Sequence, residues 1–233
     1  LKQTNRIDFY NKYSIYTLMI KAVLFDLDGT LLDTSRGILE SVAHTIHKLG
    51  LPMLPQEIML NFVGPPIQNS LMKYCGLNVT DAQMAANLFR DYYKESALFE
   101  AKPYDGIFEL LNTLQERQIK IGVATYKRED YAIQLLSHFG IASYCQVMHG
   151  ADNNNILSKA DIVSLCCREL QVDSASIALV GDTNHDAVGA LKAGVGFIAV
   201  TWGFGYKVGD DTASMNVPCL GVVDTPNEIL SLL

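Results

Sequence analysis

Asp26 and Asp28 stand one residue apart, directly after a run of strand-forming residues that begins at Lys21. Alternate side chains of an extended chain face the same side, so both carboxylates are expected at the mouth of one buried strand. Two like charges are costly to bury unless a cation neutralises them or they share a proton. The pair therefore indicates cation-assisted chemistry, although aspartates in a turn can also simply cap backbone amides. A calcium loop fits less well, because Gly29 comes too early for an EF-hand and no glutamate closes the loop.

A second acidic pair, Asp182 and Asp186, lies in a loop that leads from a predicted strand into a helix. Thr125 ends another predicted strand, and Lys159 begins a helix that lies between Thr125 and Asp182 in the sequence. In parallel sheets, ligands bind beyond the carboxyl ends of the strands, where these side chains are expected to meet. Together with the first pair they form an oxygen-rich site of the kind that Mg²⁺ prefers, completed by water and phosphate oxygens. Asp186 could alternatively cap the helix that follows it.

Three histidines and one lysine near these motifs are weaker candidates. Lys127 follows Thr125 in a loop, where it is either a solvated charge or a phosphate contact. His185 stands among the acidic residues, but a nitrogen ligand does not suit Mg²⁺, so we expect a residue at the rim of the site. His44 and His47 lie one helical turn apart without an evident third ligand, which favours partly exposed helix residues.

The apolar pattern changes from period two to helical after Asp33 and returns to an alternating plan at Pro103. The stretch between them is expected to form helices with no strand. The first of these helices contains Ile38 and ends at Gly50. The last is a longer helix that is capped by Thr80 or Asp81 and reaches about residue 99. Two shorter helices are expected between these, over residues 55–62 and 67–74.

The remainder of the chain alternates between helices and apolar strands, which indicates right-handed crossovers and a parallel sheet covered on both faces. We therefore predict an α/β, Rossmann-like, doubly wound parallel sheet that carries an inserted all-helical unit. The domain limits are expected at 1–18 for an N-terminal extension, 19–33 with 103–233 for the core, and 34–102 for the helical insertion. Helices are expected over 107–117, 130–139, 159–170, 186–192 and from Pro226, and strands over 119–125, 144–148, 177–182, 197–201 and 221–223.

Composition excludes several classes of protein. With 49% apolar and 18% charged residues among 233, the chain is globular, and its net charge of −7 gives no footprint for nucleic acid or an anionic membrane. Five cysteines without a Cys-x-x-Cys pair argue against a disulfide framework and favour a reducing cytoplasm. Residues 1–18 mix basic and apolar residues, but no cleavage site follows and nothing is long enough to span a bilayer.

At this point the sequence resembles a known group. The segment Asp26-Leu-Asp28-Gly-Thr, the threonine that ends the next core strand, Lys159 and Gly181-Asp182-x-x-x-Asp186 follow, in order, the four motifs of the haloacid dehalogenase superfamily. The likeness runs from about Met19 to the C-terminus. The insertion resembles the helical type-1 cap of phosphoglycolate-phosphatase-like members, and residues 62–66 stand where those relatives place a substrate-specificity loop. Tyr126 departs from the family, which often has a small or amide residue there.

The resemblance implies a Mg²⁺-dependent phosphatase that acts on a small phosphorylated metabolite. Asp26 would be the nucleophile that forms an aspartyl phosphate, and Asp28 would protonate the leaving oxygen and later take a proton from water. The implied metal ligands are Asp26, Asp182, the backbone carbonyl of Asp28, and Asp186 directly or through a water. The implied contacts to phosphate and substrate are Gly29, Gly64, Pro65, Thr125, Tyr126, Lys127 and Lys159.

Other activities share parts of this pattern. A dehalogenase lacks the second aspartate, so Asp28 argues against it. A sugar phosphomutase has the same motifs and cap, and sequence separates it only weakly from a phosphatase. A receiver-like phosphoacceptor domain also combines acidic residues with a threonine and a lysine, but it has no helical insertion. Phosphoglycolate, a nucleoside monophosphate, a sugar phosphate or pyrophosphate would present the same phosphoryl group to such a core, and we expect a monomer or a homodimer.

Overall fold

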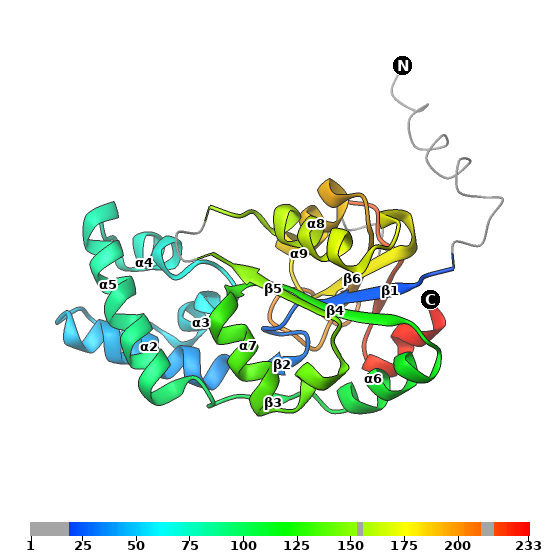
Figure 1. Cartoon of the computed structure of the whole chain (residues 1–233). Coiled ribbons are helices and arrows are strands. Elements are labelled where there is room, and N and C mark those ends of the chain that lie inside the picture. The colour runs from blue at the N-terminus through cyan, green and yellow to red at the C-terminus, as the bar shows by residue number, and fades with distance from the viewer. Residues whose placement is uncertain (1–18, 153–155, 211–216) are drawn as a thin grey trace, which may run out of the picture.

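The computed structural model describes residues 19–152, 156–210 and 217–233, and the predicted extension over 1–18 lies outside them. Its centre is a six-stranded sheet in the order β5-β4-β1-β6-β7-β8, in which every pair of neighbours is parallel (Figure 1). The strands are β1 (Ala22–Phe25), β4 (Lys120–Arg128), β5 (Val147–Ala151), β6 (Ile177–Gly181), β7 (Gly196–Val200) and β8 (Gly221–Val223).

Helices cover both faces of the sheet, as the continuous apolar strands predict. Alternate residues of β1 face opposite layers: Val23 and Phe25 pack with α6 (Ile107–Glu116) and α7 (Glu129–His138). Ala22 and Leu24 pack in the cluster of α8 (Lys159–Leu170) and α9 (Asn184–Ala193). Figure 1 shows α8 and α9 on one side of the sheet and α6 on the other. The prediction of a doubly wound α/β fold is confirmed.

The sheet order decides where the motifs meet. β1 lies between β4 and β6, and Phe25 is in register with Val123 and Val180. The ends of β1 and β6 therefore lie side by side, next to a β4 strand that continues further. Asp26 and Asp182 directly follow β1 and β6, and Thr125 lies two residues past Val123 within β4, so the three side chains arrive at one edge of the sheet although they are distant in sequence.

A helical segment, residues 34–102, projects from this edge and lies at the left of Figure 1. A short antiparallel pair joins it to the sheet, in which Asp33 of β2 (Leu32–Asp33) faces Lys102 of β3 (Lys102–Pro103). The expectation of no strand up to residue 102 is therefore wrong at its last residue. The helices of this segment are α2 (Ser35–Lys48), α3 (Gln56–Met59), η1 (Leu60–Phe62), α4 (Ile67–Cys75), α5 (Val79–Tyr92) and the π-turn η2 (Tyr93–Ala97).

Several element ends differ from the sequence-based expectation because local hydrogen bonds decide them. Asn78, and not Thr80 or Asp81, caps α5, since its Oδ1 accepts the Asp81 amide at 2.9 Å. The strand expected from residue 144 begins at Val147, because a 3₁₀ turn, η3 (Ile141–Tyr144), comes first. Elsewhere, β4 extends three residues past Thr125, α9 begins at Asn184, a short turn η4 (Ser174–Ser176) precedes β6, and the last helix is the 3₁₀ segment η5 (Pro226–Ser231).

Candidate active site

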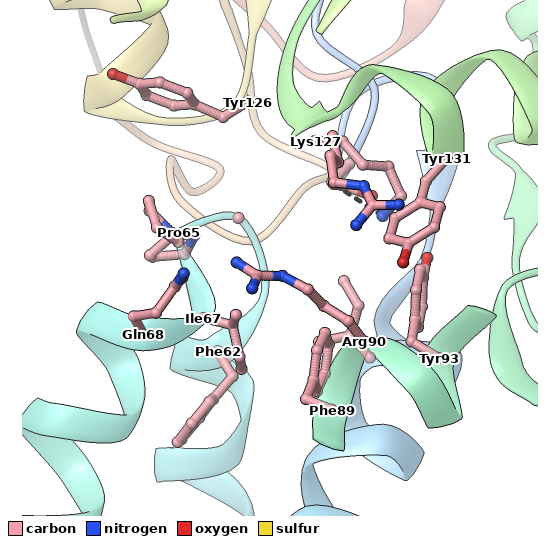
Figure 2. Close-up of a pocket in the computed structure, with 15 residues that line it drawn as sticks. Phe62, Pro65, Ile67, Gln68, Phe89, Arg90, Tyr93, Tyr126, Lys127 and Tyr131 are labelled. Carbon is pink, nitrogen blue, oxygen red and sulfur yellow. Dashed lines mark hydrogen bonds and ion pairs between the residues drawn. The ribbon is translucent and has the colours of Figure 1, made fainter. Parts of the chain in front are cut away.

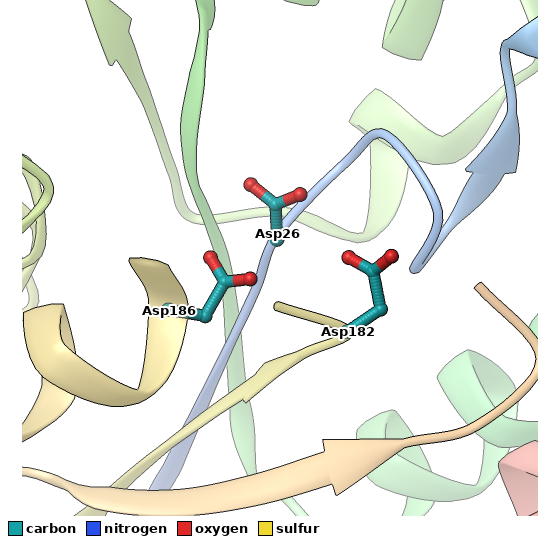
Figure 3. Close-up of side chains that lie close together, drawn as sticks. All are labelled: Asp26, Asp182 and Asp186. Carbon is teal, nitrogen blue, oxygen red and sulfur yellow. The ribbon is translucent and has the colours of Figure 1, made fainter. Parts of the chain in front are cut away.

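Three carboxylates gather at the carboxyl edge of the sheet. Asp26 follows β1, Asp182 follows β6, and Asp186 stands in the first turn of α9, and one oxygen from each lies within 4.8 Å of the others (Figure 3). All three are buried. Sheet register brings the first two together, and the short loop from β6 into α9 adds the third.

Lys159 lies between two of these carboxylates. Its Nζ contacts Oδ1 of Asp26 and Oδ1 of Asp186, each at 2.6 Å. Ser158 caps α8 and so fixes the backbone of Lys159 at the first helical position. Gly189 makes room for the lysine stem, because a Cβ there would lie 2.5 Å from Lys159 Cγ. Burial alone would lower the pKa of Lys159, but Asp186 and Asp26 raise it above its usual value, so the ammonium stays charged.

One carboxylate oxygen of Asp182 accepts hydrogen bonds, and the other has no hydrogen-bond partner in the described chain. Its Oδ2 accepts the amides of Phe204 at 2.7 Å and Gly205 at 3.3 Å. Its Oδ1 is buried and has no hydrogen-bond partner among the residues that the structure describes. Burial, and then the charges of Asp186 and Asp26, raise the pKa of Asp182 to about 7. An unpartnered buried carboxylate oxygen of this kind is costly unless a ligand satisfies it.

When all three carboxylates of this centre are ionised, their charges do not balance without a further cation. Burial raises the pKa of Asp26 to about 7, against the opposing effect of Lys159 and with the help of Asp186 and Asp28. When the three carboxylates are ionised, Lys159 neutralises only one of them. Two uncompensated charges and an unpartnered oxygen among carboxylate donors fit a hard divalent cation such as Mg²⁺.

Asp186 has two structural tasks here. Its Oδ2 accepts hydrogen bonds from the backbone amide of Thr183 at 3.1 Å and from its hydroxyl at 2.6 Å, which completes a capping box at the start of α9. Its other oxygen contacts Lys159. The sequence allowed Asp186 to cap the helix or to serve the site, and its position combines helix capping with contact to the lysine of the site.

The carboxylate of Asp28 lies outside the cluster of three. β1 ends at Phe25, so the alternation of an extended strand does not continue through Asp28. Its Oδ1 accepts the Thr34 hydroxyl at 2.6 Å and lies 3.0 Å from Lys127 Nζ. The lysine side chain is only 6% exposed, so Lys127 is not the solvated charge that the sequence allowed. Its position beside Asp28 explains why its pKa stays above the usual value in spite of burial.

A cavity of about 100 Å³ separates the sheet edge from the helical segment (Figure 2). We call it the interface cavity. Asp28, Tyr126 and Lys127 line it from the core, and Gly64 and Pro65 line it from the helical segment. The complete lining is Asp28, Ile38, Phe62, Gly64, Pro65, Pro66, Ile67, Gln68, Phe89, Arg90, Tyr93, Tyr126, Lys127, Arg128 and Tyr131.

The remaining predicted residues divide into two groups. Thr125 is buried, and its Oγ1 accepts the Lys127 amide at 3.1 Å. His185 packs edge-on against Tyr126, with ring centroids 5.8 Å apart, close to the lysine of the site. His44 instead stacks on Tyr92 in the helical segment, and His47 is exposed there.

The loop after β7 was missed by the sequence reasoning, yet it holds Asp182. Trp202 Nε1 donates to the Thr30 carbonyl at 3.1 Å, which ties this loop to the first motif. A Cβ at Gly203 would lie 2.4 Å from Asp182 Oδ2, and one at Gly205 would lie 2.2 Å from its carbonyl oxygen. Two glycines around one aromatic residue were the available signal that a backbone approaches something closely here.

Gly29→Ala should disturb this packing. Gly29 has φ +83°, and a Cβ there would lie 2.4 Å from Asp182 Oδ2. We expect the variant to lose about 2–4 kcal/mol of unfolding free energy, from backbone strain plus displacement of the aspartate. Gly50→Ala is the matched control, because Gly50 has φ +66° but nothing within 4 Å, so it should lose only about 1 kcal/mol. Equal losses in urea unfolding would contradict close packing at Gly29.

Comparisons with known proteins indicate which family this chain belongs to. Residues 23–200 match the model of the family described as haloacid dehalogenase-like hydrolase. Tyrosine-protein kinase PtkA of Mycobacterium tuberculosis is 32% identical over 212 residues, which cover 90% of this chain and 72% of PtkA. A 5'-nucleotidase of Pseudomonas aeruginosa is 31% identical over 186 residues, or 79% of this chain and 84% of that protein.

A solved structure supports the same assignment. The crystal structure described as a predicted phosphatase from Clostridium acetobutylicum has a TM-score of 0.83 and 33% identity, and it covers 91% of this chain and 97% of that one. The match over residues 23–200 includes the aspartates, the lysine and the intervening helical segment described above. This chain belongs to the family of haloacid dehalogenase-like hydrolases.

Proposed function

We propose that this protein is a Mg²⁺-dependent phosphatase that hydrolyses a small phosphorylated metabolite through an aspartyl phosphate on Asp26. The observation that carries the proposal is the position of Asp26, which contacts the ammonium of Lys159 and clusters with Asp182, a carboxylate that has one unpartnered oxygen. The similarity to a protein named 5'-nucleotidase and to a structure described as a predicted phosphatase supports a phosphate ester as substrate.

The residues of the site divide the reaction into two steps. A carboxylate oxygen of Asp26 attacks phosphorus as the bond to the leaving oxygen breaks, and Asp28 gives that oxygen a proton. Water then attacks the aspartyl phosphate, Asp28 takes its proton, and phosphate leaves with Asp26 restored. Lys159 and Thr125 hold the phosphoryl oxygens, while Thr34 and Lys127 orient Asp28 at the wall of the interface cavity.

Asp26, Asp182 and the backbone carbonyl of Asp28 would hold the metal, with Asp186 directly or through a water. When bound, Mg²⁺ reduces the repulsion between the attacking carboxylate and the phosphate and neutralises charge on the phosphoryl oxygens. The unpartnered Oδ1 of Asp182 is the atom that most needs such a ligand.

The test is release of inorganic phosphate from a panel of phosphorylated metabolites in the presence of Mg²⁺. A sugar phosphomutase, the second candidate from the same motifs, would produce a phosphate isomer without stoichiometric release of phosphate. Analysis of both products in one reaction separates the two activities. A protein that releases no phosphate from any member of the panel would contradict the proposal.

We propose that residues 34–102 act as a cap that closes over the substrate. The two connections to the core lie side by side in the β2–β3 pair, which suits a hinge, and the cap reaches the core at the interface cavity. Closure would exclude bulk water and bring the loop of residues 62–66 over the leaving group.

Pro65→Ala should then change selectivity among phosphate esters by about tenfold. Pro65 lines the interface cavity on the cap side, whereas the carboxylate cluster lies in the core. Metal dependence should stay the same, because the core supplies the chemistry common to all substrates. Met53→Ala is the control, since Met53 is exposed on the same segment and does not line the cavity. An unchanged ranking of kcat/KM across the panel would place selectivity elsewhere.

A reducing compartment such as the cytoplasm is the proposed place of this reaction. All five cysteines are free thiols, and burial raises the pKa of Cys145 and Cys166 to about 12 each, so neither forms a reactive thiolate. No helix in the described ranges is long and apolar enough to cross a membrane.

A further inference from the structure

Arg90 is a cation without an ionic partner at the cap side of the interface cavity. It extends from α5 into the cavity, and Figure 2 shows its guanidinium pointing across the cavity toward Pro65. Its Nη1 donates to Asn87 Oδ1 at 3.2 Å, and no carboxylate of the described chain forms an ion pair with it. A guanidinium has five donors, so most of them remain free for a ligand.

The other two cations of the cavity are already paired. Lys127 contacts Asp28, and Arg128 contacts Asp130 and packs over the ring of Tyr131 at 4.0 Å. Burial lowers the pKa of Arg90, and the nearby guanidinium of Arg128 lowers it further. Two neighbouring guanidiniums with only one paired leave an excess of positive charge in this part of the cavity lining.

Gln68 adds an unsatisfied polar group to the same place. Its side chain lines the cavity from α4, and its Oε1 is buried without a hydrogen-bond partner in the described chain. A carboxamide offers one acceptor and two donors, and a half-turn exchanges them. Because Gln68 and Arg90 line the same cavity, the carboxamide and the fork of Arg90 are together suited to the oxygens of a carboxylate or a phosphate.

From these contacts we infer that the leaving group of the substrate carries a second anionic group, which Arg90 binds with the help of Gln68. This inference rests on the proposed phosphatase activity and names its substrate class: phosphate esters or anhydrides of small acidic leaving groups. The cavity of about 100 Å³ supports a small leaving group, because pockets for larger ligands occupy roughly 300–1,000 Å³. The second anion is either a carboxylate or another phosphate, since both present oxygens to the same fork.

The test compares matched substrates in one assay. 2-Phosphoglycolate and 2-hydroxyethyl phosphate differ in whether the leaving group ends in a carboxylate or a hydroxyl, and pyrophosphate supplies the phosphate alternative. The wild-type kcat/KM should favour at least one anionic substrate over 2-hydroxyethyl phosphate by about tenfold or more. Arg90→Met should reduce that ratio by about 10- to 100-fold, and Arg90→Lys should reduce it less, because it keeps the charge but loses the fork.

Lys94→Met is the matched control. Lys94 is exposed one turn along from Arg90 and does not line the cavity, so its loss removes the same charge without the proposed contact. An equal fall in the ratio for Lys94→Met, or a wild-type enzyme without preference for either anionic substrate, would overturn the inference. The proposed function fails separately, if the wild type with Mg²⁺ releases phosphate neither from 4-nitrophenyl phosphate nor from any member of the panel of phosphorylated metabolites. Which anionic substrate responds to Arg90→Met decides between a carboxylate and a phosphate.

Discussion

Asp26→Asn should reduce phosphatase turnover by at least about a thousandfold. The substitution keeps the size of the side chain but removes the attacking charge and one of the three clustered carboxylates. The fold should survive, because burial already disfavours the charged form of Asp26 and raises its pKa to about 7. Above that pH, the metal-free variant should unfold at the same temperature as the wild type or higher. Activity and thermal unfolding are measured on the same preparation.

The control for this variant is Asp105→Asn, which makes the same change at an exposed residue outside the site. Its turnover should equal that of the wild type. Intact mass must exclude deamidation of the introduced asparagine, because a small fraction of regenerated aspartate would imitate residual activity. Near-normal phosphate release by the intact variant would remove Asp26 from the role of nucleophile. A large fall in unfolding temperature would instead show that Asp26 supports the fold.

Removal of divalent metal should abolish activity, and Mg²⁺ should restore it. Ca²⁺ should substitute poorly, because it takes a larger and looser coordination shell than a site with few carboxylates provides. Mg²⁺ should also raise the unfolding temperature, which reports binding without catalysis. Asp182→Asn should lose most of that stabilisation, since the unpartnered Oδ1 of Asp182 is the expected ligand. Full activity after exhaustive chelation would contradict a metal-dependent mechanism.

The stabilisation by Mg²⁺ should depend on pH with a definite sign. Asp26 and Asp182 have folded pKa values of about 7, raised from 3.8, so the folded protein binds more protons than the unfolded chain between these values. Their contribution to the stability of the metal-free fold is therefore complete below pH 3.8 and is lost as the pH rises through about 7. Protons compete with the metal for the same oxygens. The rise in unfolding temperature caused by Mg²⁺ should be larger at about pH 8 than at about pH 5.5, and the reverse order would contradict this assignment.

Much of the fold and the identity of the charged residues followed from the sequence because they depend on local patterns. The apolar runs of β1 and β6 and the glycine after Asp28 specify strands that end in tight turns. The limits of α8 and β8 agree with their expected residues, since Ser158 caps the helix and both elements have short, clear patterns. Motif order along the chain was sufficient to indicate the family.

The partners of the charged residues were decided only by tertiary structure. Asp28 meets Lys127, which is 99 residues away, because β1 and β4 are neighbours and β4 continues past Thr125. Asp182 is held by amides of the loop after β7, and no pattern within β6 or α9 indicates that loop. In the sequence, Arg90 is one ordinary basic residue on an amphipathic helix. Only the packing of the helical segment against the sheet shows that its guanidinium lies in a cavity without a carboxylate partner in the described chain, because burial and pairing depend on residues distant in sequence.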